Sequence, residues 1–214
     1  MFELIKAGGW LMAPIILFSV IAVGIILERF WTLQTRKVIP KHLVATIWHW
    51  IKEGQLERSK IDEIGKQSAL GKVLAAGLNN RHKDRDRIKE SIEEAGRKVV
   101  HEMERFLNTL GTIASITPLI GLLGTVIGMI KVFNAITTEG VGNAAPLAGG
   151  ISQALVTTAG GLSVAIIALM FYRYFRGRVD ELVVQMEEEA IKMVDVLNDN
   201  RHIVSAKDKS EKAA

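Results

Sequence analysis

The chain has 214 residues, of which 49% are hydrophobic and 23% are charged, with a formal net charge of +4. Its mean hydropathy of +0.22 is too apolar for an ordinary soluble domain, so the composition predicts membrane spans joined to polar, water-facing segments. There is no cysteine, which excludes a disulfide framework and a thiolate metal site. Lys and Arg are interleaved with Asp and Glu in the polar segments, so membrane topology explains the basic excess better than nucleic acid binding does.

The first apolar run covers residues 7 to 27, which carry no charge and are long enough to cross a bilayer. Trp10 at one end and Trp31 at the other are aromatic residues of the kind that prefer the headgroup region. A secretory signal is the alternative, but the usual basic start and a small-residue cleavage pattern are missing. We therefore predict a periplasmic N-terminus and a first transmembrane helix over 1–34.

The next segment, 35–105, is polar and is predicted to be a helical cytoplasmic loop. Pro40 and Gly54 bracket a helix over 41–52, and shorter helices are expected near 56–66 and 69–79. From Arg85 onward, apolar residues recur at helical spacing: Ile88, Ile92, Ala95, Val99, Met103, Phe106 and Leu110. This spacing predicts that the second span begins as a long cytoplasmic helix.

Residues 106 to 172 contain only two charged side chains, Lys131 and Glu139, both in the short section between two apolar runs. We predict a second transmembrane helix over 106–133, a short periplasmic loop over 134–146 and a third transmembrane helix over 147–174. One apolar stripe continues past the third span: Val179, Leu182, Met186, Ala190, Met193 and Leu197. The segment 175–214 is therefore predicted to be a cytoplasmic helix with a disordered tail in its last dozen residues.

The predicted fold class is all-α: a polytopic membrane protein with three transmembrane helices, the second and third extended far into the cytoplasm, plus a helical cytoplasmic loop. Residues 28 to 105 and 173 to 214 lie on the same side of such a membrane and hold 25 of the 27 basic residues. Because basic residues favour the cytoplasmic side, the N-terminus is predicted to be periplasmic and the C-terminus cytoplasmic.

The second span contains small and polar residues that contact with lipid does not require. Gly121, Gly124 and Gly128 indicate a face on which another helix backbone approaches closely. Pro118 removes one backbone hydrogen bond, so we expect a bend or a freed carbonyl near Ala114, which Thr117 could satisfy. Thr125 is the first candidate for a polar lining. The alternative is a hydrogen bond from its hydroxyl to the carbonyl four residues back.

In the third span, Gln153 and Thr157 lie one turn apart beside a face of small residues that includes Thr158 and Gly161. A glutamine at membrane depth requires a hydrogen-bond partner, but it cannot change its charge. The central part of each span lacks Asp, Glu, Lys, Arg and His, so this chain alone offers no titratable group for a proton relay. The five histidines are scattered, and no nucleotide-binding loop, metal site or cofactor site is predicted. An enzyme is not expected.

These residues resemble the MotA/TolQ/ExbB proton channel family, most closely its ExbB branch, over essentially the whole chain. The resemblance rests on residues 117–126, which read Thr-Pro-Leu-Ile-Gly-Leu-Leu-Gly-Thr-Val, and on residues 150–162, which read Gly-Ile-Ser-Gln-Ala-Leu-Val-Thr-Thr-Ala-Gly-Gly-Leu. It implies a homopentamer in the bacterial inner membrane around two single-span ExbD-like partners, whose membrane aspartate carries the proton. It also implies action through a TonB-like protein on outer-membrane transport.

By the same resemblance, Thr125 and Thr158 match the pore-facing threonines of the family. Many members carry a glutamate where this chain has Gln153, which cannot accept a proton at ordinary pH. A TolQ-like role in envelope maintenance and a non-conducting membrane scaffold therefore stay open beside the ExbB-like motor. A MotA-like flagellar stator fits less well because it has four spans. The predicted residues are, for the proton pathway, Thr125, Thr157, Thr158 and Gln153, and for helix packing or a kink, Pro118, Gly121, Gly124, Gly128 and Gly161.

Overall fold

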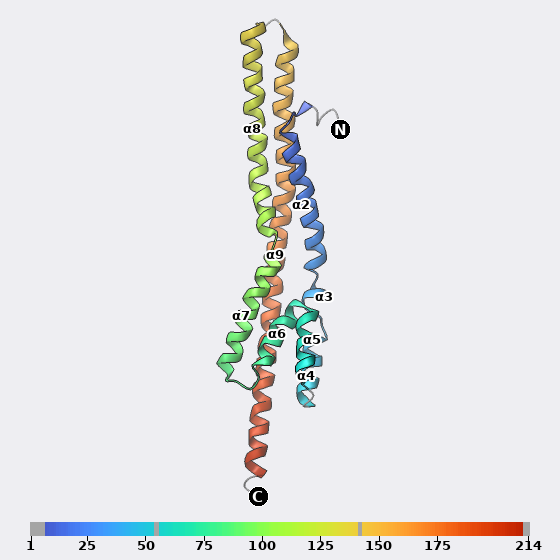
Figure 1. Cartoon of the computed structure of the whole chain (residues 1–214), viewed down its shortest axis with the longest axis vertical. Helices are drawn as coiled ribbons and strands as arrows, with labels where there is room; N and C mark the ends of the chain where they lie inside the picture. Colours follow the sequence, from blue (N-terminus) through green and yellow to red (C-terminus); the bar gives the residue numbers. More distant parts are fainter. Residues whose placement is uncertain (1–6, 54–55, 141–142, 212–214) are drawn as a thin grey trace. The chain divides into compact units, whose positions relative to one another are not determined.

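The structure is a computed structural model that describes residues 7–53, 56–140 and 143–211, which form helices joined by short connections without any strand (Figure 1). The chain divides into two compact units. Unit 1 comprises residues 1–29 and 106–176, and unit 2 comprises residues 30–105 and 177–214. The helices are α2 (Met12–Thr32), α3 (Thr35–Val38), α4 (Leu43–Lys52), α5 (Arg58–Gln67), α6 (Ala69–Asn79), α7 (Arg85–Glu104), α8 (Leu107–Glu139) and α9 (Ala144–Glu211).

Three helical segments of the described chain are long and apolar enough to cross a membrane: Met12–Thr32, Arg85–Glu139 and Ala144–Leu197. Each overlaps one of the three predicted spans. This confirms the predicted fold class, an all-α polytopic membrane protein in which the second and third membrane helices are much longer than the first. Many large apolar side chains of these spans remain exposed in the single chain, among them Leu17, Val20, Leu27, Leu119, Leu122, Leu155 and Ile166. Lipid or other protein chains must cover them.

Unit 1 contains α2, α8 and the first part of α9. In Figure 1, α8 and α9 form an antiparallel pair, and α2 lies along α9, starting some distance from the α8–α9 turn. The helix α8 continues to Glu139 and α9 starts at Ala144. Most of the segment predicted as the loop 134–146 is therefore helical. The chain reverses at Gly140, where φ is +75°, a conformation that glycine adopts without steric cost.

The second membrane segment is interrupted between α7 and α8. Phe106 adopts φ +65°, in the left-handed region, so the helix stops at Glu104 and restarts at Leu107. The Phe106 side chain is 40% exposed, and the guanidinium of Arg29 lies 5.5 Å from the centroid of its ring. The apolar spacing alone predicts one uninterrupted helix here, because a two-residue break leaves the apolar residues on both sides of it in place.

Unit 2 is built from the short helices α3 to α6, from α7 and from the second part of α9. The core of α5 and α6 consists of fully buried aliphatic residues: Ile61, Ile64, Leu70, Leu74 and Leu78. Ser68 caps α6, since its Oγ accepts a hydrogen bond of 3.0 Å from the backbone N–H of Gly71. The helices predicted at 41–52, 56–66 and 69–79 correspond to α4, α5 and α6, whereas Gly54 lies outside the described residues.

The helix α9 runs without interruption to Glu211, so it extends into the segment predicted to be a disordered tail. No proline or glycine follows Gly177, and the last segment is rich in Ala, Lys and Glu, which propagate a helix well. Residues 212–214 lie outside the described residues.

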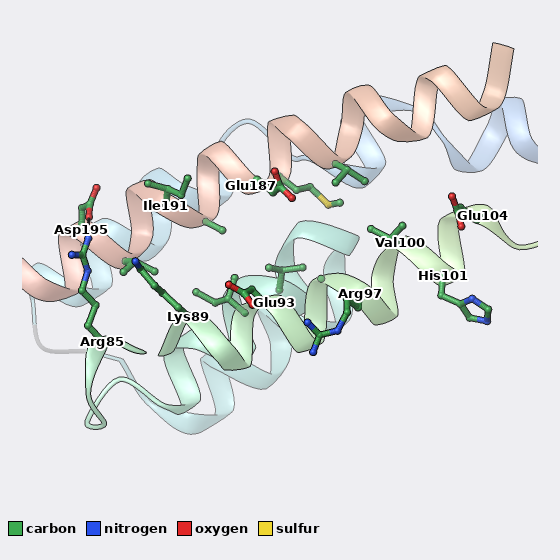
Figure 2. Close-up of a pocket in the computed structure, with 17 residues that line it drawn as sticks. Arg85, Lys89, Glu93, Arg97, Val100, His101, Glu104, Glu187, Ile191 and Asp195 are labelled. Carbon is green, nitrogen blue, oxygen red and sulfur yellow. Dashed lines mark hydrogen bonds and ion pairs between the residues drawn. The ribbon is translucent and has the colours of Figure 1, made fainter. Parts of the chain in front are cut away.

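A groove with a volume of about 810 Å³ runs between α7 and α9 in unit 2 (Figure 2). Its apolar lining comes from Val73, Ile92, Met186, Ala190 and Val194, and its charged lining from both helices. Arg85 of α7 reaches across to Asp195 of α9, with 3.0 Å between Nη2 and Oδ1. None of the residues predicted to line a proton pathway lies in this groove.

Candidate functional site

The predicted site residues meet where α8 packs against α9 in unit 1. The backbones approach closely because glycine faces the partner helix at successive turns. A Cβ atom built on Gly124 would lie 2.6 Å from the Thr157 Cβ, and one on Gly128 would lie 2.6 Å from the Gly150 carbonyl oxygen. A Cβ on Gly161 would lie 2.8 Å from the Thr117 carbonyl oxygen. Any side chain at these positions would force the helices apart.

Pro118 lies within α8, which continues on both sides of it. The hydroxyl of Thr117 donates a 2.5 Å hydrogen bond to the carbonyl of Ile113, four residues back, and Thr117 is fully buried. Its hydroxyl therefore bonds a carbonyl one residue before Ala114, where the freed carbonyl was expected. Thr117 itself belongs to the packing surface between α8 and α9.

Thr125 and Thr158 lie at nearly the same level on the two helices, and each is half-buried. The Thr125 hydroxyl donates to the carbonyl of Leu122, 2.6 Å away and three residues back in α8. The Thr158 hydroxyl crosses between the helices and donates to the Gly121 carbonyl at 2.9 Å. Since a hydroxyl has one donor and two acceptor sites, both oxygens keep acceptor capacity toward a group outside the pair.

Thr157 is adjacent to Thr158 in sequence but is fully buried. Its hydroxyl lies 2.6 Å from the carbonyl of Gln153 in the same helix and 3.1 Å from the carbonyl of Gly8. Gly8 belongs to the segment that leads into α2. Thr157 thus joins three helical segments: its side chain packs on Gly124 of α8, and its hydroxyl ties α9 to the start of α2.

Gln153 lies one turn before Thr157 and is 6% exposed. Its Oε1 accepts a hydrogen bond of 2.7 Å from the ammonium group of Lys131 on α8. Its Nε2 is buried, has no hydrogen-bond partner among the described residues, and lies against Gly9: a Cβ on Gly9 would be only 2.5 Å from it. The sequence predicts a hydrogen-bond partner for the Gln153 amide, and Lys131 is that partner for its oxygen, Oε1.

Helix geometry divides the four predicted pathway residues between two flanks of the α8–α9 pair. Successive residues are about 100° apart, so Thr125 and Lys131 are about 120° apart on α8, and Gln153 and Thr158 are about 140° apart on α9. Lys131 bonds Gln153, and Gln153 lies against Gly9. We call this side, with Lys131, Gln153 and Thr157, the α2 flank, and the side with Thr125 and Thr158 the open flank.

The role of Lys131 and of the Gly8-Gly9 pair was not evident from sequence patterns. Lys131 looks like a charge at the border of a span, and glycines ahead of a helix look like a flexible start. One signal was present: Lys131 is the sole basic residue between positions 106 and 172. An isolated charge beside a polar amide in a neighbouring span is a reason to pair the two. No group of three or more metal-ligating side chains occurs in the part of the chain that the structure describes.

The fold and this site define a multi-pass membrane protein. Its second and third spans pack against each other through small residues and carry threonine hydroxyls at this contact. The model of the MotA/TolQ/ExbB proton channel family matches residues 65–188, which include both α8 and the membrane part of α9. The chain belongs to this family.

Among known proteins, an ExbB-like biopolymer transport protein of Synechocystis sp. is 34% identical over 169 residues, which cover 78% of this chain. An ExbB homologue of Methanothermobacter thermautotrophicus is 32% identical over 86% of this chain. The chain spans 66% of the length of each of these two relatives. The Tol-Pal system protein TolQ of Pseudomonas aeruginosa is 27% identical over 80% of this chain and 79% of its own length.

Proposed function

We propose that this chain is an ExbB-like subunit of a proton-channel motor in the bacterial inner membrane. In this proposal, five copies surround ExbD-like single-span partners, and the proton gradient drives motions that act through a TonB-like protein on outer-membrane transport. The N-terminus is periplasmic and the C-terminus cytoplasmic. Family membership and the similarity to ExbB-like proteins support this assignment.

The observation that carries the proposal is the pair of hydroxyls on the open flank. Thr125 and Thr158 are half-buried at one level, with their protons directed to backbone carbonyls. Their oxygens can therefore accept a hydrogen bond from a protonated carboxylic acid or a protonated water without any rearrangement. To donate to a carboxylate, each hydroxyl must rotate away from its backbone carbonyl.

This geometry favours a pathway in which the titrating group comes from outside the chain. Between Leu107 and Ile130, and between Gln153 and Tyr172, the sequence contains no Asp, Glu, Lys, Arg or His. A membrane aspartate of a partner helix would supply the charge, and the threonines would stabilise its protonated form during transfer. Gln153 and Thr157 belong to the α2 flank, so in this mechanism they support the wall, and their predicted lining of the pathway stays a prediction.

Proton flux into vesicles tests the role of the open flank. With an ExbD-like partner present, we expect Thr125→Val and Thr158→Val each to lower the flux about fivefold, the effect of losing one neutral hydrogen bond of about 1 kcal/mol. Thr112→Val is the matched control, because Thr112 also bonds a backbone carbonyl of α8 but lies away from the site. Unchanged flux in both variants, with assembly intact, would rule out the role of these threonines.

The two remaining interpretations predict different results. A TolQ-like subunit, which the similarity to TolQ supports, would conduct protons with its own partner but would not restore energised transport in cells that lack ExbB. A non-conducting scaffold, suggested by Gln153, would show no proton flux with any single-span partner. A neighbouring gene for a small one-span protein with a membrane aspartate would favour either motor over the scaffold.

A further inference from the structure

The most unusual charge in unit 1 is Lys131. Its ammonium group has three donors, and the Gln153 amide oxygen takes one of them at 2.7 Å. Apart from Glu3, which is not described, the acids of unit 1 are Glu28 and Glu139. Glu28 binds Arg29, and Glu139 accepts a hydrogen bond from Asn143. No ion pair to Lys131 is formed in the described part of unit 1, and two of its three N–H donors have no partner among the described residues.

The depth of Lys131 identifies what surrounds it. From Trp10 to Arg29 there are 19 residues, or about 29 Å of helix, and from Gln153 to Arg173 there are 20 residues, or about 30 Å. Both lengths match the ~30 Å hydrocarbon thickness of a bilayer. Gln153 lies against Gly9, next to Trp10, so Lys131, Gln153 and the start of α2 share one level. That level is the headgroup region at the end of unit 1 where α2 begins.

The surroundings of Lys131 fit a lipid. Trp10 is 67% exposed, as expected for an aromatic residue between headgroups. On α8, Ile130 precedes Lys131, about 100° around the helix from it, and is more than half exposed, which leaves apolar surface beside Lys131 for an acyl chain. Lys131 lies on the α2 flank, about 120° around α8 from Thr125, so it faces away from the proposed proton pathway.

We propose that Lys131 and Gln153 form a binding site for the phosphate of an anionic phospholipid. The ammonium group donates its two remaining N–H groups to phosphate oxygens, and Gln153 is the positioning residue that holds the ammonium against α9. Gln153 is only 6% exposed, and its Nε2 has no hydrogen-bond partner among the described residues. The site is therefore polar, built from a buried side chain, and incompletely satisfied by the residues that the structure describes.

Binding of phosphatidylglycerol to the full chain in detergent, followed by native mass spectrometry, tests the site. Diacylglycerol, which has the same acyl chains and no phosphate, serves as the reference lipid. We expect the preference for phosphatidylglycerol to fall about fivefold in Lys131→Gln, as for loss of one lysine at a membrane surface, and to persist in Lys131→Arg. Arg173→Gln, which removes one exposed charge at the other end of the membrane part of α9, is the matched control and should retain more of the preference than Lys131→Gln.

Three results would overturn the proposal. In the first, Lys131→Gln lowers the preference no more than Arg173→Gln does. In the second, millimolar inorganic phosphate displaces the lipid, which would make free phosphate the ligand. In the third, Lys131→Gln leaves lipid binding unchanged but weakens co-purification of a single-span partner with a membrane aspartate, which would assign the counter-charge to that partner. If Lys131→Gln fails to fold, the absence of a preference for phosphatidylglycerol in the wild type or in Lys131→Arg would still overturn the proposal. The test is independent of proton conduction.

Discussion

Thr157 and Thr158 are neighbours in sequence and identical in chemistry, yet they lie on different sides of the packed α8–α9 pair. Thr157 is fully buried, with its hydroxyl shared between the carbonyls of Gln153 and Gly8. Thr158 is half-buried and donates across to Gly121 on the open flank. The two side chains are about 100° apart around α9. This difference places Thr157 where three segments meet and leaves Thr158 accessible to a group outside the chain.

The two flanks also differ in what completes them. On the α2 flank, the chain itself supplies most partners, since Gly8, Gly9 and Lys131 approach Gln153 and Thr157. On the open flank, the hydroxyls bond only backbone carbonyls and keep acceptor capacity. Stability is therefore expected to depend on the α2 flank and on the helix contact, whereas conduction is expected to depend on the open flank.

The largest effect is expected from Gly124→Ala, which acts on the contact that both flanks share. The new Cβ would lie 2.6 Å from the Thr157 Cβ, so α8 and α9 must separate, at a cost of about 2 to 3 kcal/mol. Gly24→Ala is the control, because no atom beyond the local helix lies within 4 Å of a Cβ at that position in α2. Unfolding in detergent measures both variants, and equal stabilities would show that the close contact between α8 and α9 is not required.

Thr157→Val separates the two flanks directly. Valine keeps the shape of threonine but leaves the buried carbonyl of Gly8 without this donor, so we expect a loss of about 1 to 2 kcal/mol in stability. Proton flux per assembled complex should stay near the wild-type value. Thr158→Val should show the converse, with near-normal stability and low flux. A strong loss of flux in Thr157→Val at full assembly would place the pathway on the α2 flank.

The overall helical architecture was predictable because long apolar runs and helical spacing report burial directly. The three spans follow from charge-free length, and the helix α4 follows from the residues that bracket it in sequence, Pro40 and Gly54. The break at Phe106 was not predictable, because it preserves the apolar spacing on both sides. In the segment 134–146, predicted to connect the second and third spans, Thr137, Thr138 and Glu139 are polar but continue α8.

The candidate site was predictable in its residues but not in their grouping. Gln153, Thr157 and Thr158 stand out in sequence because polar side chains at membrane depth need partners. Which partner each one has depends on the register of α8 against α9 and on where α2 begins, and both are tertiary properties. Spacing within one helix places Thr157 on the face of Gln153, but it cannot show that Gly8 approaches this face.

A smaller effect is expected from Gly9→Ala at the start of α2. Gly9 has φ +70°, which costs an alanine about 1 kcal/mol, and a Cβ there would contact the end of the Gln153 side chain. Gly9→Ala in a Gln153→Ala background is the matched control, because it keeps the same backbone conformation and removes the side chain that the new Cβ would contact. Unfolding should show a loss from Gly9→Ala in both backgrounds, larger in the one that retains Gln153. Equal losses would show that the Gln153 side chain moves aside without an energetic cost, so that it is not held rigidly against Gly9.

The smallest effect is expected where a charge pair lies in water, in contrast to Lys131. Glu94 and Lys98 on α7 are 2.7 Å apart, and this hydrogen bond and the lysine charge lower the pKa of the Glu94 carboxyl from its ordinary value of 4.5. A lowered pKa in the folded state stabilises the fold above the unfolded-state pKa, and this contribution disappears as the pH falls through the folded-state pKa.

Because both side chains are exposed, solvent and salt screen the pair. Glu94→Gln should therefore lower stability less than Gly9→Ala does at pH 7 in low salt, and not measurably in high salt or well below pH 4.5. A loss that persists in high salt would show that Glu94 has a structural partner beyond Lys98.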